Sequence, residues 1–289
     1  MSTQLALVTG ANRGLGYGIA KKLAKKGFRV VVTSRDKARA DEAAAKIKAE
    51  VAGADVKGAA LDLASLASVR AFAAAFAKEE PVLDVLINNA GIMFQDKERK
   101  LSPDGHELTF ATNHLGHFLL TTMLLSNLKA APEARVVVVS SRLHLPKSMG
   151  TEVRFDFDDI DMNRDYDPMR AYKNSKLANI WFVKELQRRM QGSSVTVNAV
   201  CPGFVPETIA EQAHGLQRFL MKHVMPHLPM AHSVDEATDT FLKAATDPAL
   251  KGKGGELYGE MKVVASSPES HDTGKQRRLW EISEKLVTA

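Results

Sequence analysis

Residues 5–16 read LALVTGANRGLG, an apolar run that enters a glycine turn and continues into a helical pattern. Gly10, Gly14 and Gly16 follow the spacing G-x-x-x-G-x-G. Glycine lets the backbone turn tightly and approach a ligand, and the free N–H groups at a helix N-terminus attract an anion. Glycines after a strand also mark ordinary turns, but the order strand, turn, helix favours a site for a phosphate group.

The rest of the chain repeats this alternation of short apolar runs and helical patterns. Helical patterns cover 14–27, 36–52 and 65–79, which suits crossover connections. Continuously apolar runs are typical of strands buried on both faces of a parallel sheet. The six expected strands begin at residues 5, 28, 56, 83, 134 and 195, and a short seventh is expected at 255–260. Because no Gly/Ser-rich linker or repeat divides the chain, residues 1–289 are predicted to form one doubly wound α/β domain.

The composition is globular, since 45% of the 289 residues are hydrophobic and 25% are charged. Lys and Arg exceed Asp and Glu by 39 − 34 = 5, but they are scattered, so nucleic acid is not an expected partner. Cys201 is the only cysteine, which excludes an intramolecular disulfide and fits a reducing compartment. The chain shows neither a basic, apolar leader nor an apolar run of roughly 18 residues. A cytoplasmic protein without a stable membrane anchor is therefore expected.

The second strand ends in VVTSRD, residues 31–36, and this end indicates which dinucleotide is bound. Ser34 stands where an NAD-binding sheet usually has a carboxylate for the ribose hydroxyls, and Arg35 follows it. Arg13 in the glycine turn offers a second cation to a 2′-phosphate. Each arginine alone is equally typical of a solvated surface, and Asp36 is an unfavourable neighbour. Two cations converging on one site nevertheless predict NADP(H) rather than NAD(H).

A second motif, AYKNSKLANI at 171–180, places Tyr172 and Lys176 four positions apart in a helical pattern. Residues at this separation share one helix face, with Cβ atoms about 6 Å apart. An ammonium beside a phenol favours the phenolate and makes the tyrosine a usable acid or base. A lone Y-x-x-x-K also arises by chance, so the pair depends on the other motifs.

Two further motifs complete the pattern: NNAG at 88–91 and the serine pair Ser140 and Ser141, each at the end of an expected strand. Together with TGANRGLG and the Tyr-Lys pair, they resemble the short-chain dehydrogenase/reductase family over nearly the whole chain. The segments TNHLGHFLLT (112–121) and LWEISEKLV (279–287) are similar to the branch of retinol dehydrogenases and light-dependent protochlorophyllide reductases. The resemblance implies a single Rossmann-type domain, with a parallel sheet expected to have seven strands.

The resemblance also implies catalytic roles. Tyr172 would be the general acid or base, Lys176 would lower its pKa and bind the nicotinamide ribose, and Ser141 would hydrogen-bond the substrate oxygen. Asn113 would hold a water linking Lys176 to solvent. Two alternatives stay open: Ser140 replaces Ser141 if the strand register slips by one, and Asn113 only caps or bends a helix.

Several other polar residues are interpreted as structural. His114, His117 and His144 are expected to be packing or loop histidines, because Tyr172 already supplies the acid or base. Cys201 is expected to be a small core residue.

For the cofactor, the resemblance implies contacts from the glycine turn and from the loops after several strands. The predicted cofactor-binding residues are Gly10, Asn12, Arg13, Gly14, Leu15, Gly16, Ser34, Arg35, Asp62, Leu63, Asn89, Ala90, Gly91, Tyr172, Lys176, Pro202, Gly203, Val205 and Thr208. In many relatives a threonine lies four positions beyond the Pro-Gly pair, whereas Thr208 is five beyond Gly203. Its contact with the nicotinamide carboxamide is therefore open.

From Ser141 to Tyr172 is 172 − 141 = 31 positions, so an insertion at about 142–170 lies beside the expected active site. Its stretch VRFDFDDIDMNRDYDPM is rich in aspartate, but the spacing is not that of an EF-hand, and no metal site is predicted. A lid is expected at about 204–230. Apolar residues near the expected pocket mouth are Met93, Phe94, Leu143, Leu145, Phe204 and those of 216–230. As a group they favour a bulky apolar substrate, although each is also explained by core packing.

These features predict an NADPH-dependent reductase, or alcohol dehydrogenase in reverse, acting on an apolar aldehyde or ketone. Ala178 stands where photoreductases commonly have a cysteine, which disfavours light-driven chemistry. The alternative is a non-catalytic NADP(H)-binding sensor, which would not need the proton-transfer groups. The terminal helix pattern, with Leu279, Ile282 and Leu286 at helical spacing, is expected to pack on its own domain or on a second subunit of a homo-oligomer.

Overall fold

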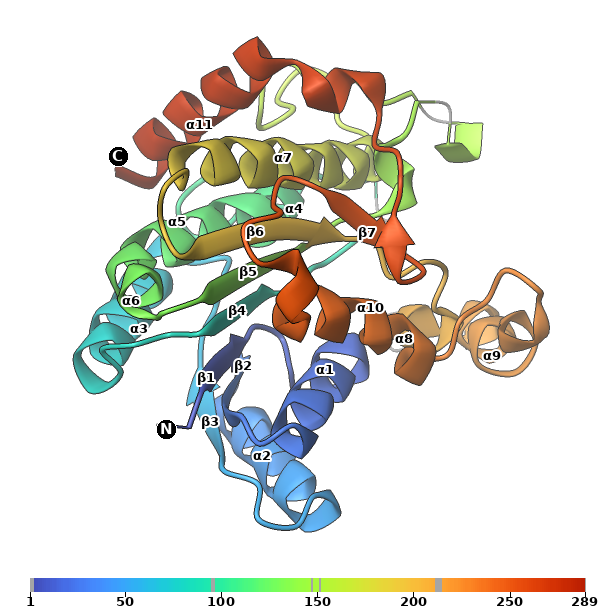
Figure 1. The fold of residues 1–289 in the computed structure, drawn as a ribbon. Helices are drawn as coiled ribbons and strands as arrows, with labels where there is room; N and C mark the ends of the chain where they lie inside the picture. The colour runs from blue at the N-terminus through green and yellow to red at the C-terminus, as the bar shows by residue number, and fades with distance from the viewer. Residues whose placement is uncertain (1–2, 95–96, 147, 151, 211–214, 289) are drawn as a thin grey trace.

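Eight strands form one sheet in the order β3-β2-β1-β4-β5-β6-β7-β8 (Figure 1). The computed structural model describes residues 3–94, 97–146, 148–150, 152–210 and 215–288. The strands are β1 (Leu5–Val8), β2 (Arg29–Ser34), β3 (Val56–Ala60), β4 (Val85–Asn88), β5 (Ala134–Val139), β6 (Val195–Val200), β7 (Leu257–Gly259) and β8 (Lys262–Val263). All neighbouring pairs from β3 to β7 are parallel. The predicted doubly wound α/β fold is confirmed, and all seven predicted strands are present.

The eighth strand was not predicted. β8 pairs antiparallel with β7, with Tyr258 opposite Val263. The chain reverses between them at Glu260 and Met261, whose φ angles are 50° and 62°. Positive φ at both turn residues is the geometry of a tight hairpin, usually made with Asn or Gly. Because neither residue type occurs at this turn, the sequence carried no hairpin signal.

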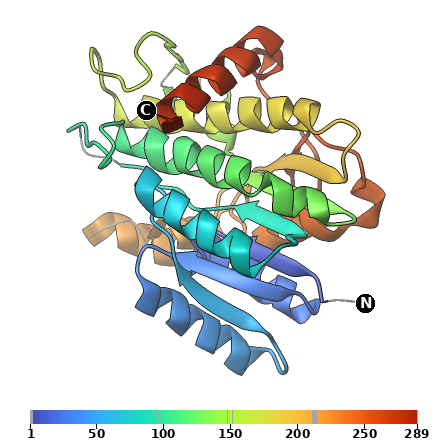
Figure 2. The ribbon, with the colours of Figure 1, turned by 90° about the vertical axis from the view of Figure 1, so that its left-hand side faces the viewer.

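The helices cover the sheet in two layers (Figure 2). The helices α1 (Gly14–Lys25), α2 (Lys37–Glu50) and α10 (Val234–Thr246) pack on one face around Ile19, Ile47 and Phe241. The other face carries α3 (Leu66–Glu79), α5 (Gly116–Met123), α6 (Leu125–Ala130) and α7 (Pro168–Arg189), as well as the short α4 (Leu108–Phe110). The first three crossover helices agree with the predicted ranges to within two residues.

Helix starts follow local capping chemistry. The Asp36 carboxylate accepts the Ala38 N–H at 2.8 Å and caps α2, and Ser65 caps α3. Asp167 caps α7 by accepting the Arg170 N–H at 2.6 Å. These side chains satisfy N–H groups that a helix start leaves unpaired. The cap on α7 matters for function because it fixes where the helix that carries Tyr172 begins.

The C-terminal helix α11 (Thr273–Thr288) packs on its own domain, outside α7. The Trp280 ring is buried, with its centroid 4.9 Å from that of Phe118 and 6.0 Å from that of Phe182. The Ser283 hydroxyl is 2.9 Å from His114 Nε2. Of the two placements predicted for this helix, the structure shows the one within the same chain.

Candidate active site

The site lies at the carboxyl edge of the sheet, where β1 and β4 are neighbours but their crossover helices lie on opposite faces. The Thr9 hydroxyl accepts hydrogen bonds from the N–H groups of Asn89 (2.9 Å) and Ala90 (3.0 Å). In return, Asn89 Nδ2 donates to the carbonyl oxygens of Thr9 and Gly10, at 2.8 and 3.2 Å. These hydrogen bonds hold the glycine turn and the NNAG loop side by side.

Gly10 and Gly16 of the glycine turn have no room for a Cβ atom. Gly10 has a φ of +60°, and a Cβ there would lie 2.8 Å from the Ala90 Cβ. A Cβ on Gly16 would lie 2.4 Å from the Gly10 carbonyl oxygen. Arg13 precedes α1 but cannot accept a bond from its first turn, since a guanidinium has no acceptor. This leaves a close-approach turn at a helix N-terminus, which fits a pyrophosphate.

The end of β2 is joined to the segment that follows β3. Ser34 is buried, and its carbonyl oxygen accepts the Leu61 N–H at 2.8 Å. Asp62 follows, and its carboxylate accepts the Ala64 N–H at 3.0 Å. Asp36, the unfavourable neighbour of Arg35, caps α2 and so has a structural role.

A hollow beside the glycine turn carries cations that the sequence analysis missed. Its lining consists of Asn12, Arg13, Gly14, Tyr17, Arg39, Glu42, Ala43 and Lys46. Arg39 and Lys46 come from α2, where their spacing looked like that of ordinary surface residues. Arg39 Nε is 3.8 Å from the Asp36 carboxylate, a long ion pair. Arg35 is exposed just beyond β2 and does not line this hollow.

Tyr172 and Lys176 lie together on α7, as their spacing predicts. The Lys176 ammonium is 5.4 Å from the centre of the Tyr172 ring and donates to the Val139 carbonyl oxygen at 3.3 Å. Only 2% of Lys176 is exposed. Val139 is the last residue of β5, so this bond fixes the lysine at the carboxyl edge of the sheet.

Burial dominates the ionisation of this pair. It raises the pKa of Tyr172 to about 12, with a smaller contribution from Cys201, while the Ser141 hydroxyl acts in the opposite direction. Burial also lowers the pKa of Lys176 to about 8. This differs from the expected depression of the phenol pKa by the ammonium, because removing the phenol from water has the larger effect.

The two serines after β5 do different things. Ser140 is buried, and its hydroxyl donates to the Lys176 carbonyl oxygen at 2.9 Å. Ser141 is half-buried, and its hydroxyl accepts the Leu143 N–H at 3.2 Å. The geometry therefore favours Ser141 as the residue that faces a substrate.

Asn113 connects two parts of the site from a π-helical turn (Ala111–Leu115) at the start of α5. Its Oδ1 accepts the Ile92 N–H at 2.8 Å, and its Nδ2 donates to the Ile92 carbonyl and to the Ser175 hydroxyl, both at 3.0 Å. The Ser175 hydroxyl in turn donates to the Tyr172 carbonyl oxygen at 2.7 Å. Asn113 thus positions both the loop after β4 and α7, and its link to water stays a prediction.

The loop after β6 packs against the glycine turn. Gly203 has a φ of +78°, and a Cβ there would lie 2.5 Å from His232. Val205 is buried against Leu15 of the glycine turn. The Thr208 hydroxyl oxygen is buried without a hydrogen-bond partner among the described residues. A buried hydroxyl of this kind suits an amide group, so Thr208 fits a carboxamide contact despite its shifted spacing.

The histidines are packing residues, as predicted. His117 is buried between the Thr9 hydroxyl (2.9 Å) and the Asn113 carbonyl (3.2 Å), and burial lowers its pKa to about 3. His114 is buried too, with a pKa lowered to about 4. His144 accepts the Ser267 N–H at 3.1 Å. Cys201 is buried in the core, which raises the pKa of its thiol.

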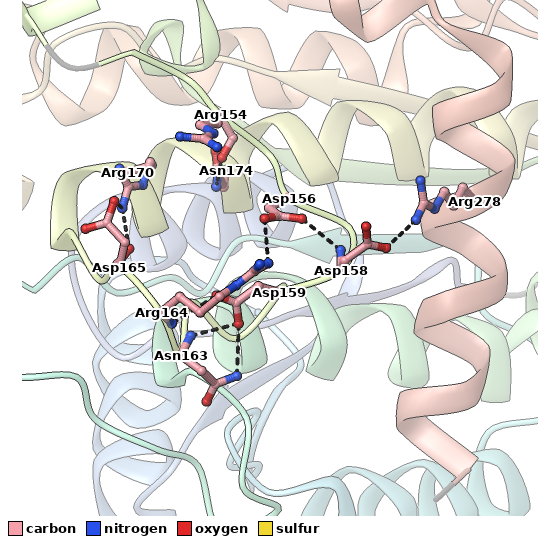
Figure 3. Close-up of polar contacts among 10 residues, drawn as sticks. All are labelled: Arg154, Asp156, Asp158, Asp159, Asn163, Arg164, Asp165, Arg170, Asn174 and Arg278. Carbon is pink, nitrogen blue, oxygen red and sulfur yellow. Dashed lines mark hydrogen bonds and ion pairs between the residues drawn. The ribbon is translucent and has the colours of Figure 1, made fainter.

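Ion pairs hold the insertion together and join it to α7, through Asp165 and Arg170, and to α11 (Figure 3). Asp159 accepts the N–H groups of Asn163 and Arg164, at 2.8 and 3.0 Å. The Arg164 guanidinium also forms an ion pair with the Asp156 carboxylate at 2.9 Å. The Arg278 guanidinium of α11 donates a hydrogen bond to the Asp158 carboxylate at 2.7 Å. The acidic stretch therefore holds the insertion in place. Its cavity is lined from α7 by Arg170, Ala171 and Asn174, and not by the catalytic pair.

The apolar residues predicted near the pocket mouth come from the loops after β4, β5 and β6. Met93, Phe94, Leu143, Leu145 and Phe204 are all half-buried. In the lid, Phe219 and Met230 are strongly exposed, with 56% and 67% of their surfaces accessible. Within the described residues, no helix combines the length and apolarity needed to cross a bilayer.

A Rossmann-type sheet with a glycine turn at its switch point, and a Tyr-Lys pair beside it, defines an oxidoreductase that uses a nicotinamide dinucleotide. The model of the short chain dehydrogenase family matches residues 4–152. The chain belongs to this family, in its retinol-dehydrogenase-like branch, which confirms the predicted resemblance.

Individual relatives cover almost the whole chain. Retinol dehydrogenase 14 from Homo sapiens is 40% identical, over 99% of this chain and 87% of the relative. Retinol dehydrogenase 13 from Homo sapiens is 38% identical, over 97% of this chain and 83% of the relative. A crystal structure of an uncharacterized protein from Mycobacterium paratuberculosis aligns with a TM-score of 0.76 at 33% identity, covering 100% of this chain and 94% of that one.

Proposed function

We propose that this chain transfers a hydride between NADP(H) and an apolar aldehyde or ketone, or the corresponding alcohol, with Tyr172 as general acid or base. The observation that carries the proposal is the convergence of Ser141, Tyr172 and Lys176 at the sheet edge beside the glycine turn. The close-approach turn and the unpartnered Thr208 hydroxyl fit a dinucleotide at the same edge.

The proton chemistry follows from the ionisation of the pair. With a pKa of about 12, Tyr172 is protonated at neutral pH and can donate to a carbonyl oxygen. The Ser141 hydroxyl would donate a second hydrogen bond to that oxygen and stabilise negative charge as it develops. Lys176, held by Val139, would bind a ribose hydroxyl and keep positive charge near the phenol. When bound, the nicotinamide supplies or accepts the hydride.

Preference for NADP(H) is supported by the charges around the end of β2. Arg13 and Arg39 line the hollow beside the glycine turn, and Arg35 is exposed directly after β2. The Asp36 carboxylate is directed to the start of α2, where it accepts the Ala38 N–H at 2.8 Å and lies 3.8 Å from Arg39 Nε. Guanidinium groups bind phosphate in a bidentate manner, which a 2′-hydroxyl does not offer.

The substrate is proposed to be apolar because half-buried apolar residues lie in the three loops after β4, β5 and β6. Two relatives are named retinol dehydrogenases, which makes a retinoid aldehyde a suitable member of a substrate panel. The test is NADPH oxidation by purified protein against aldehydes and ketones graded in size and polarity, with Tyr172→Phe as the blank. Turnover that the blank lacks supports the reductase. Tight NADPH binding without turnover on any substrate would favour a non-catalytic sensor.

A further inference from the structure

We infer that the lid segment 215–230 is a docking surface for an anionic lipid bilayer. The segment contains α9 (Gly215–His223) and the turn that follows it, and it stands out from the body at the right of Figure 1. Its exposed apolar side chains are Phe219 (56%), Val224 (43%), Leu228 (39%) and Met230 (67%). Large apolar side chains that are exposed together within one short segment mark an interaction surface more often than apolar residues scattered singly over a protein.

The charge of the segment selects the partner. Residues 215–230 read GLQRFLMKHVMPHLPM, with two permanent cations, two histidines and no acidic residue. Arg218, Lys222, His223 and His227 are all exposed. A short helix with apolar and basic side chains and no acids is typical of segments that lie in the interface of an anionic membrane. An acidic protein groove would match the cations equally, but the apolar side chains, spread over a helix and a turn, fit a fluid surface better.

Of the flanking acidic residues, Glu207 of α8 (Pro206–Ala210) is exposed and offsets part of this charge, whereas the two that follow the segment are engaged elsewhere. Asp235 lies 3.1 Å from Lys22 of α1. Glu236 accepts the Ser233 N–H at 2.9 Å and completes the cap of α10.

The lid is attached where docking would matter for the site. Phe204 pairs with Ala231, and the His232 N–H donates to the Phe204 carbonyl oxygen at 2.8 Å. These contacts join the first residue of the expected lid region to the residues that follow segment 215–230. Phe204 directly follows Gly203 of the loop after β6, which packs against the glycine turn. A docked lid would therefore turn the pocket mouth toward the lipid, where an apolar substrate of the proposed reaction accumulates.

The test is cosedimentation of the full chain with vesicles, without cofactor or substrate, so that it does not depend on the proposed activity. Vesicles of phosphatidylcholine alone are compared with mixed phosphatidylcholine and phosphatidylserine vesicles, at low and high salt. We expect binding to the anionic vesicles only, and loss of that binding at high salt as the charges are screened. Failure to bind anionic vesicles at low salt would overturn the inference.

Two double variants locate the binding surface. Arg218→Gln with Lys222→Gln, and Phe219→Ser with Met230→Ser, should each weaken binding to anionic vesicles by about tenfold or more. Matched controls elsewhere are Lys25→Gln with Lys26→Gln and Val82→Ser with Leu101→Ser, which should bind as the parent does. Thermal unfolding by circular dichroism verifies that each variant is folded.

Equal binding by the parent and both lid variants would overturn the inference. So would a parent protein that ignores vesicles but forms a dimer, if that dimer is lost in the Phe219→Ser, Met230→Ser variant. In that case a second copy, and not a bilayer, would be the partner of the lid.

Discussion

The Ser140 hydroxyl donates a hydrogen bond to the Lys176 carbonyl oxygen at 2.9 Å and ties the end of β5 to α7. The neighbouring Ser141 instead faces the phenol of Tyr172. The two serines directly follow β5 and their hydroxyls have different partners, so Ser140 holds the helix while Ser141 does not.

This division predicts different results for two alanine variants. Ser141→Ala should lower kcat by about 10²- to 10³-fold, because it removes a donor to the developing oxyanion. Ser140→Ala should lower the free energy of unfolding by about 1 kcal/mol and reduce kcat much less. Steady-state kinetics and urea denaturation of both variants check the assignment. A larger loss of kcat in Ser140→Ala, at intact stability, would make Ser140 the substrate-binding serine.

Replacing Tyr172 by Phe should reduce turnover by about 10²- to 10⁴-fold, the usual contribution of a positioned general acid. NADPH affinity, measured by fluorescence titration, should change little. The matched control is Tyr258→Phe, since Tyr258 is a buried tyrosine of β7 that packs in the core on the α1 side. It should keep most of the activity. A fully active Tyr172→Phe enzyme would move the proton donor elsewhere.

Arg39→Ala should weaken NADPH binding by about ten- to a hundredfold, because a hydrogen bond to a charged group contributes about 1.5–3 kcal/mol. NADH binding should be unchanged, since NADH lacks the 2′-phosphate. Arg35→Ala should behave in the same way. Calorimetric titration of both cofactors against each variant separates the two dissociation constants.

The control for these variants is Arg277→Ala, an exposed arginine on α11. It should bind both cofactors as the parent does. Equal weakening of NADPH and NADH by Arg39→Ala would assign that side chain to the shared part of the cofactor.

The buried histidines predict loss of stability in acid. The pKa of His117 is lowered from 6.5 to about 3, and that of His114 to about 4. Between these values and 6.5, the unfolded chain binds more protons than the folded one. The free energy of unfolding therefore falls as pH drops below 6.5, with a slope of up to about 1.4 kcal/mol per pH unit for each histidine.

Replacing His117 by Gln should remove one of these contributions and flatten the pH dependence. Urea denaturation at several pH values between about 4 and 7 measures the slope. His223→Gln, at an exposed position of α9, is the matched control and should leave the slope unchanged. Identical slopes for the parent and His117→Gln would show that His117 is not buried as a neutral group.

The features that depend on residues close together in the chain were predictable. The strand LALV, the glycine turn and α1 are adjacent in the chain, so apolar runs and glycine spacing describe them directly. The Tyr172 and Lys176 relationship was predictable for the same reason, because four positions on a helix fix a shared face. The packing role of His117 followed from the presence of a better acid, and its burial agrees.

Other features depended on residues far apart in the chain. Arg39 lines the hollow beside the glycine turn only because α2 packs there. Asp158 of the insertion is paired with Arg278 of α11, a pairing that no local pattern reveals. Burial, which raises the pKa of Tyr172 although Lys176 is near, also depends on the assembled site.

The sequence by itself determined the doubly wound fold, the glycine turn and the pairing of Tyr172 with Lys176, because periodicity and spacing act over a few residues. Only the tertiary structure decided which serine hydroxyl bonds the Lys176 carbonyl oxygen, that α11 packs on its own domain and that Asp36 caps a helix. Each of these depends on which segments meet in space, and that is set by packing and hydrogen bonds between distant parts of the chain.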